Sequence, residues 1–280
     1  MRSSFLHCLG PHGFHRLHYT EWGDRSCRHV VICAHGLTRN GRDFDTLASR
    51  LSERCRVICP DIVGRGRSDW LPEKADYGYP LYLDDMAALI ARSGAEQVDW
   101  VGTSMGGLIG MLLAALPGAP IRRLLINDVG PFIPVAALER IAAYVGQDQR
   151  FVDMAELEAH LRRIHEPFGP LTDAQWRHLA EHGARRADDG RFALNYDPGI
   201  ADAFQGGVKD VDLWPLWDKL RCDVLVTRGG RSDLLLEDTA REMVRRGPPG
   251  TRVATFAAVG HAPMFMSDDQ IAAAEGFLFG

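Results

Sequence analysis

The segment VDWVGTSMGG, residues 98–107, holds the side chain best suited to chemistry in this sequence, the hydroxyl of Ser104. A strand-like run ends at Gly102, and an apolar run of helical type begins just after the serine. A sharp strand-to-helix bend pushes a serine outward, and a side chain at Gly102 or Gly106 would collide with the neighbouring strand or helix. The first N–H groups of the helix also point toward such a serine. The spacing predicts a nucleophile that attacks a carbonyl, whereas an ordinary turn serine would not need these glycines.

A serine hydroxyl becomes a useful nucleophile when a base lies within hydrogen-bonding reach and an acid orients that base. Among the 11 histidines, His261 alone follows a strand-like run with a glycine before it and a proline soon after, in VGHAPMF. This pattern indicates a loop at a strand end. We therefore predict His261 as the base; the alternative is a loop histidine that only packs.

Two aspartates could orient that histidine. Asp233 lies a few residues after the strand-like run in CDVLVTRGGRSD, and Asp128 ends the run in LLINDVGP. An aspartate beside a Gly-Pro turn can simply cap the turn. The chain order serine, acid, histidine favours Asp233, and Asp128 remains the rival.

The negative charge that develops during attack on a carbonyl needs two N–H donors. One is predicted to be the backbone of Met105, right after the serine. The other is predicted to be the backbone of Leu37, after the strand-like run HVVICAHG. His35 in that loop is interpreted as a structural hydrogen-bonding residue. Arg39 borders the same pocket and could bind a substrate carboxylate, although such arginines are more often solvated.

Apolar residues are predicted to complete the pocket. Phe132 and Ile133 lie just past the strand that ends near Asp128, and Trp214 is a further candidate, although core packing would explain it as well. They favour a small or medium apolar substrate group. No metal site is predicted, because His160 and His165 are five residues apart, which does not put both on one helix face, and no acidic partner lies at metal-ligand spacing.

Short strand-like runs alternate with helical patterns, which predicts a mostly parallel sheet covered on both faces. The alternation breaks between Val129 and Trp214, where the chain reads as a helical insertion without a buried strand. The strand-like runs are residues 15–23, 29–36, 56–61, 97–104, 122–130, 222–230 and 252–260; the helical runs are 42–53, 82–94, 106–116, 237–247 and 268–279.

Composition excludes several classes of protein. With 280 residues and 46% hydrophobic content, the chain can bury a large core. A net charge of −5 leaves no basic excess for nucleic acid. No apolar run of about 18 residues is present, so no membrane span is expected. The first residues do not resemble a signal peptide, and the six cysteines lack zinc-type spacing. We therefore expect free thiols and a cytoplasmic protein.

These motifs resemble the α/β-hydrolase fold superfamily. The resemblance is carried by AHGLTRNGRDFDTLA, PDIVGRGRSD, VGTSMGGLIG, the SD pair at 232–233 and VGHAP, and it extends from about residue 15 to the end. It implies a mostly parallel, eight-stranded α/β-hydrolase sheet. It also implies a core domain of residues 1–130 and 215–280, with a helical cap at 131–214.

The resemblance implies a serine hydrolase of the carboxylesterase type that forms an acyl-enzyme on an ester or lactone, without a cofactor. Relatives that open epoxides or remove halogens use an aspartate where Ser104 stands. Carbon–carbon bond hydrolases of ring-cleavage products often carry a tryptophan where Ala262 stands, which makes that activity a weaker alternative. A lyase and a small-molecule receptor without turnover are further alternatives on the same fold. The sequence gives no signal for the oligomeric state.

Overall fold

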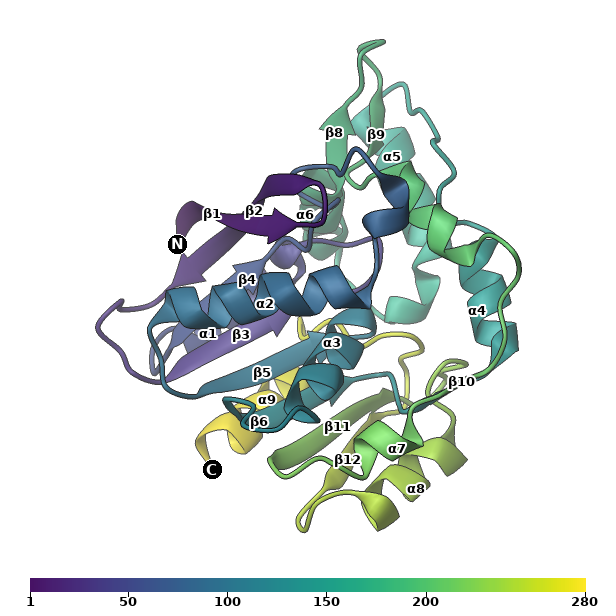
Figure 1. Ribbon diagram of the computed structural model, residues 1–280. Coiled ribbons are helices and arrows are strands. Elements are labelled where there is room, and N and C mark those ends of the chain that lie inside the picture. Colours follow the sequence, from purple (N-terminus) through teal and green to yellow (C-terminus); the bar gives the residue numbers. More distant parts are fainter.

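The computed structural model describes residues 1–280 and contains one eight-stranded sheet. Its central and distal strands run parallel, and only β1–β2 and β2–β4 pair antiparallel, which confirms the predicted mostly parallel sheet (Figure 1). In spatial order the strands are β1 (Arg2–Gly10), β2 (Gly13–Trp22), β4 (Arg56–Pro60), β3 (Val30–Ala34), β5 (Val98–Thr103), β6 (Ile121–Asn127), β11 (Asp223–Gly229) and β12 (Arg252–Phe256).

Strand β1 was not predicted from the sequence. It pairs with β2 from Arg2 opposite Glu21 to Gly10 opposite Gly13, around a tight turn. Most of its residues are exposed or half-buried, because it is the edge strand of the sheet. An edge strand with little burial has no continuous apolar run, so its sequence carries a weak signal.

Helices cover both faces of the sheet, and β3 illustrates the reason for its continuous apolar sequence. Val30 and Ile32 belong to the larger hydrophobic core, whereas Val31 and Cys33 belong to the core on the opposite face. All its residues are therefore buried. The larger core includes side chains of α2 (Tyr79–Ser93), α3 (Met105–Ala114), α7 (Trp214–Trp217) and α8 (Glu237–Arg246); the other contains those of α1 (Asp45–Leu51) and α9 (Asp268–Phe279).

The segment between β6 and β11, residues 128–222, is largely helical, as predicted, but it also contains short strands. Two small two-stranded sheets form there, one from β7 and β10 and one from β8 and β9. The elements are β7 (Phe132–Ile133), α4 (Val135–Ala142), α5 (Met154–Ile164), η3 (Glu166–Phe168), α6 (Asp173–Gly183), β8 (Ala184–Arg186), β9 (Phe192–Leu194), η4 (Pro198–Phe204), β10 (Val211–Asp212) and α7; two further 3₁₀ helices, η1 (Gly41–Phe44) and η2 (Lys74–Asp76), lie before it.

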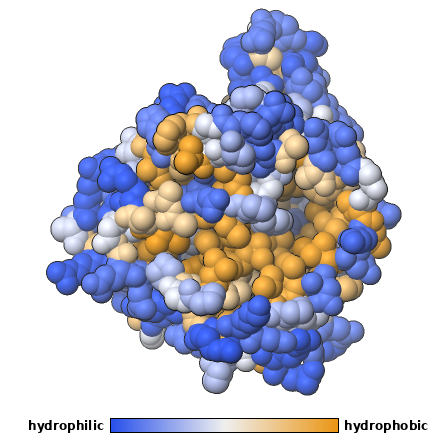
Figure 2. All heavy atoms as spheres, in the orientation of Figure 1, coloured by the Kyte–Doolittle hydropathy of each residue, from blue (hydrophilic) through white to orange (hydrophobic).

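This inserted segment lies against the loops that follow the parallel strands, at the upper right of Figure 1. The Asn40 side chain, after β3, donates to the carbonyl of His182, and Gly66 N–H, after β4, donates to Asn195. Gly260 N–H, after β12, donates to Pro167. Figure 2 shows apolar residues gathered between the sheet elements and α4 in the same view, framed by hydrophilic ones. The insertion thus covers the edge at which parallel sheets carry their sites.

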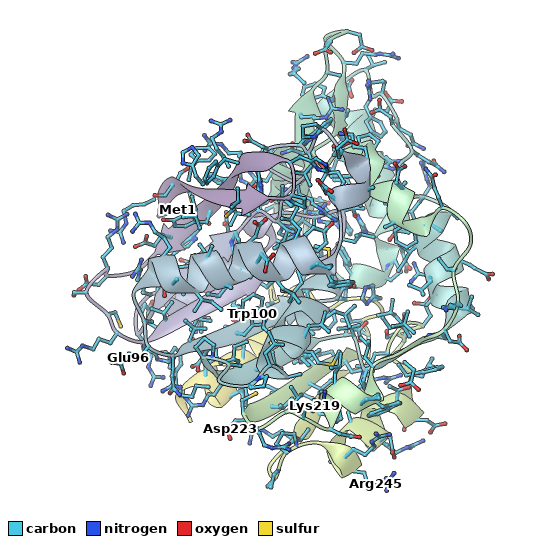
Figure 3. The ribbon with its side chains drawn as sticks, viewed as in Figure 1. Met1, Glu96, Trp100, Lys219, Asp223 and Arg245 are labelled. Atoms are coloured by element: carbon cyan, nitrogen blue, oxygen red, sulfur yellow. The ribbon has the colours of Figure 1, made fainter.

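Large side chains fill the interior. Trp100 is fully buried beneath α2 and α3, and its indole N–H donates to the carbonyl of Gly106 at 2.9 Å (Figure 3). All six cysteines are free thiols. None of the helices combines the length and the apolar character that a bilayer crossing requires.

Candidate active site

Ser104 lies at the bend between β5 and α3, in a strained backbone conformation with φ of 51° and ψ of −114°. A Cβ atom on Gly102 would lie 2.2 Å from the carbonyl oxygen of Gly106. A Cβ atom on Gly106 would lie 2.0 Å from the carbonyl oxygen of Ala34 in β3. Both contacts are far too short, so the steric reason predicted for these two glycines is confirmed.

The structure places His261 beside Ser104. The Nε2 atom of His261 lies 3.1 Å from the Ser104 hydroxyl, and its Nδ1 atom lies 2.8 Å from Oδ2 of Asp128. Because the Asp128 carboxylate can only accept a hydrogen bond, Nδ1 of His261 carries the proton that it accepts. The other nitrogen, Nε2, is therefore free to accept a hydrogen bond from the Ser104 hydroxyl. The Asp128 side chain is fully buried and that of His261 is 16% exposed.

Asp128 is held by the adjacent strand β11. Its Oδ1 accepts the N–H of Gly229 at 2.8 Å, and its Oδ2 also accepts the hydroxyl of Ser232 at 2.7 Å. The backbone of Asp128 has a positive φ of 56°, which is uncommon for a residue other than glycine. These contacts fix the carboxylate in one orientation toward His261.

The preference for Asp233 as the orienting acid is therefore corrected. Its carboxylate pairs with Arg140 of α4, at 2.6 and 2.9 Å, and its side chain is 55% exposed. Asp128 directly follows the last residue of β6, whereas Asp233 comes after Ser232, beyond the end of β11 at Gly229. Ser232 is the residue of the SD pair that reaches the site, and sequence reasoning missed it.

Asn127, which sequence reasoning also missed, joins the strand ends around the site. Its amide donates to the Thr103 hydroxyl at 2.9 Å and to the carbonyl of Pro263 at 2.7 Å. Its carbonyl accepts the Thr227 hydroxyl at 2.8 Å. The ends of β5, β6 and β11 and the loop after His261 are thus fixed to one another.

His35 is a structural residue, as predicted. Its Nε2 accepts the N–H of Ile62 at 2.9 Å, so Nδ1 carries the proton and donates to the carbonyl of Gly36 at 2.7 Å. Complete burial lowers the pKa of His35 to about 4. The imidazole is therefore neutral at pH 7 and holds the loop that contains Leu37.

Arg65, in the GRGRS segment, supports the same loop from below. It is fully buried, and its guanidinium donates to the carbonyl of Leu37 at 2.8 Å. It also donates to the carbonyl of Val63 and the hydroxyl of Tyr82, at 2.7 and 2.9 Å, and one nitrogen lies 3.6 Å from the sulfur of Met105. No carboxylate pairs with it, so a positive charge lies beside both residues predicted to bind an oxyanion.

A cavity of about 260 Å³ opens at Ser104 and His261 and is bordered by both the sheet loops and the inserted segment. Leu37 and Arg39 line it, but the Arg39 guanidinium is already bound at two points to Asp43, at 2.6 and 2.9 Å. The other lining residues are His35, Gly36, Thr38, Asp43, Phe44, Thr103, Arg140, Ile141, Tyr144, Ile164, His165, Pro167, Phe168, Arg231, Asp233, Ala262, Pro263 and Met264.

Three predicted pocket residues lie elsewhere. Phe132 and Ile133 pair with β10, and Ile133 is buried in the larger core. Trp214 packs against that core, with the guanidinium of Arg246 4.4 Å from its ring. None of these three side chains lines the cavity at Ser104 and His261.

The sequence of this chain matches a family model and the sequences of two named hydrolases. The model of a family described as the alpha/beta hydrolase family matches residues 31–274. The chain belongs to the alpha/beta hydrolase family. This hydrolase is 47% identical to a 3-hydroxybutyrate-oligomer hydrolase of Cupriavidus necator, over 100% of this chain and 98% of that protein. It is 32% identical to a 2-(acetamidomethylene)succinate hydrolase of Mesorhizobium japonicum, over 74% of this chain and 72% of that protein.

A solved structure supports the assignment. The alpha/beta hydrolase from Novosphingobium aromaticivorans superimposes on this hydrolase with a TM-score of 0.88 and 39% sequence identity, over 99% of this chain and 97% of that one.

Two groups of side chains in this hydrolase have the donors and spacing of metal ligands, and neither borders the cavity. Asp45 of one group binds Arg42, which lies outside the group, whereas Asp85 and His15 of the other group are hydrogen-bonded to each other at 3.0 Å. The groups are Cys8, His15 and Asp85, and Asp45, His178 and His182.

Proposed function

We propose that this hydrolase cleaves carboxylic esters through a catalytic triad of Ser104, His261 and Asp128. The observation that carries the proposal is the hydrogen-bond chain from the Ser104 hydroxyl through both nitrogens of His261 to the buried Asp128, beside a cavity that Ser104 and His261 line. A serine, a histidine and an acid in this order supply the nucleophile, the base and the group that orients the base.

In the first step His261 accepts the proton of Ser104 through Nε2 as the serine oxygen attacks the ester carbonyl. Asp128 holds the imidazole and stabilises its charged form. His261 then protonates the departing alcohol, which leaves an acyl group on Ser104. A water molecule, deprotonated by the same histidine, attacks the acyl group and releases the acid.

We assign the binding of the oxyanion that forms in each step to the backbone N–H groups of Leu37 and Met105. Met105 is the first residue of α3, so its N–H has no acceptor within the helix. The Leu37 loop lies close to the nucleophile, since a Cβ atom on Gly36 would be 3.8 Å from Cβ of Ser104. Arg65 binds the carbonyl of Leu37 and adds a positive charge beneath both donors.

The first candidate substrates are esters between hydroxy-carboxylic acids, with short oligomers of 3-hydroxybutyrate foremost. The support is the 47% identity along the whole chain to a hydrolase of such oligomers, together with a cavity suited to a small molecule. Residues 131–214 are proposed to act as a cap that selects the substrate, because α4, α5 and η3 contribute Ile141, Ile164 and Phe168 to the cavity.

The test is hydrolysis of linear 3-hydroxybutyrate dimer, of a lactone and of a series of p-nitrophenyl esters by the native enzyme and by Ser104→Ala. We expect turnover of the dimer and a loss of about 10⁴- to 10⁶-fold in kcat in the variant. Ser26→Ala, at an exposed serine, is the matched control and should retain native activity. Binding of the dimer without release of product would instead indicate a receptor, and turnover by Ser104→Ala would exclude Ser104 as nucleophile.

A further inference from the structure

Among the charged side chains that line the cavity, Arg231 is the one cation without an acidic partner. Arg39 is bound at two points to Asp43, and Arg140 at two points to Asp233. The side chain of Arg231 makes no hydrogen bond or ion pair and is exposed. The cavity-lining arginines and aspartates therefore leave one net positive charge, which favours an anionic ligand.

The position of Arg231 identifies the part of the substrate that it would meet. Its backbone N–H donates to the carbonyl of Val259 at 2.9 Å, so its loop is fixed to the loop that carries His261. Because His261 protonates the departing alcohol, this side of the cavity receives the leaving group. Arg231 and Pro167 also line a second cavity, which Arg162, Glu166 and Trp176 border as well, so Arg231 lies between the two cavities.

A hydroxy-acid oligomer has a distinct chemistry at each end. Attack on the ester nearest the acid end leaves the hydroxyl-bearing part on Ser104 and releases the unit that carries the free carboxylate. That carboxylate therefore lies on the leaving-group side, close to the ester oxygen. An unpaired guanidinium on this side matches it, since guanidinium and carboxylate form two parallel hydrogen bonds.

Resting on the proposed function, we propose that Arg231 binds the free carboxylate of the leaving unit. The enzyme then cleaves the ester next to the acid end of a hydroxy-acid oligomer. Each cycle consumes one water and one ester bond and yields the free hydroxy-acid anion and the shortened, hydroxyl-terminated acid. The names of both relatives describe substrates that contain carboxylic acids, 3-hydroxybutyrate oligomers and a succinate, which agrees with an anionic substrate class.

The test compares 3-hydroxybutyrate dimer with its methyl ester, which lacks the negative charge, in the native enzyme and in Arg231→Ala. We expect kcat/KM for the free acid to fall about 10- to 100-fold, mainly through KM, with the methyl ester changed less than about twofold. Arg231→Lys should recover part of the loss. Arg245→Ala, at an exposed arginine of α8 outside the cavity (Figure 3), is the matched control and should not discriminate between the two esters.

An equal loss on both esters, or no loss on the free acid, would overturn the assignment of Arg231. Calorimetric binding of the free dimer to Ser104→Ala, and to Ser104→Ala with Arg231→Ala, tests it without turnover. If the native enzyme cleaves neither ester, the proposed function fails. Binding that weakens about 10-fold or more without Arg231 would still support the carboxylate site, and equal binding would reject it.

Discussion

Behind His261, Asp128 is fully buried and accepts hydrogen bonds from Gly229, Ser232 and His261, whereas Asp233, which lines the cavity, has a side chain that is 55% exposed and binds only Arg140. We call the first region the site floor (His35, Arg65, Asp128 and Ser232) and the second the site rim (Arg140, Arg231 and Asp233). The floor groups are surrounded by protein, so water cannot take the place of a lost hydrogen-bond partner. The rim groups are exposed, so water can take that place.

This difference separates two tasks. In the floor, burial strengthens each electrostatic contact and fixes its geometry, which suits the reaction steps. In the rim, solvent screens the charges and the side chains can adjust, which suits recognition of varied substrates. Changes in the floor should therefore alter kcat, and changes in the rim should alter KM.

The largest effect is expected for Asp128→Asn. The asparagine keeps the shape but can place its amide toward Nδ1, which favours the tautomer of His261 that cannot accept from Ser104. We expect kcat to fall about 10⁴-fold on any ester substrate. Steady-state kinetics, with circular dichroism as a check of folding, measures this; a loss below about tenfold would reject Asp128 as the orienting acid.

A second prediction concerns Arg65→Met, which removes the buried charge but keeps an unbranched side chain. In this variant the loop that contains Leu37 loses a hydrogen-bond donor, and the oxyanion loses a nearby positive charge. We therefore expect kcat to fall about 10²-fold and KM to change less than about threefold. Arg65→Lys should recover part of kcat. A change confined to KM would contradict this role. Because the carbonyls of Leu37 and Val63 lose a donor, stability should also fall by about 1–3 kcal/mol.

The third prediction is a pH dependence of stability that comes from His35. Its pKa is about 4 in the folded protein, below its ordinary value of 6.5, so the unfolded chain takes up the proton first as the pH falls. The stability that the neutral, buried imidazole of His35 contributes is complete above about pH 6.5. It is lost as the pH falls toward 4, at about 1.4 kcal/mol per pH unit. Urea unfolding of the native protein and His35→Asn should give a difference in stability that shrinks over this range; a constant difference would contradict the prediction.

A smaller effect is expected for Ser232→Ala, which removes one donor to Asp128 but leaves Gly229 N–H and His261 in place. We expect a loss of about 5- to 20-fold in kcat, which corresponds to about 1–2 kcal/mol, within the range for a single hydrogen bond. Ser232→Thr keeps the hydroxyl and should lose less. Equal kcat for Ser232→Ala and the native enzyme would show that Gly229 alone positions the carboxylate.

The smallest effect is expected for Asp233→Asn. An exposed ion pair contributes about 0.2–1 kcal/mol, so the folding equilibrium constant should change less than about fivefold. We expect kcat on a neutral ester to change less than about twofold, because Asp233 does not contact His261. KM for an anionic ester should fall slightly, since Arg140 would gain freedom to bind the carboxylate. A loss of kcat comparable to that of Asp128→Asn would reverse the assignment of the two aspartates.

Sequence reasoning identified Ser104 and His261 as neighbours in the site because each lies in a local pattern that fixes its backbone. The glycines around Ser104 leave one possible bend, and the order of strands places the loop of His261 at the same edge of the sheet. It did not identify the apolar pocket, since Phe132 and Ile133 are as well suited to a core as to a substrate. Their burial depends on what packs against them, which no local pattern specifies.

The sequence by itself determined most of the sheet, the bend at Ser104 and the loop of His261, since these depend on periodicity and on turn residues a few positions apart. The choice between Asp128 and Asp233 was decided only by the tertiary structure. Strands β6 and β11 are adjacent and parallel, so the residues that follow them lie at the same edge of the sheet. Hydrogen bonds from Gly229 and Ser232 draw Asp128 inward, and Arg140, distant in sequence, holds Asp233 at the surface.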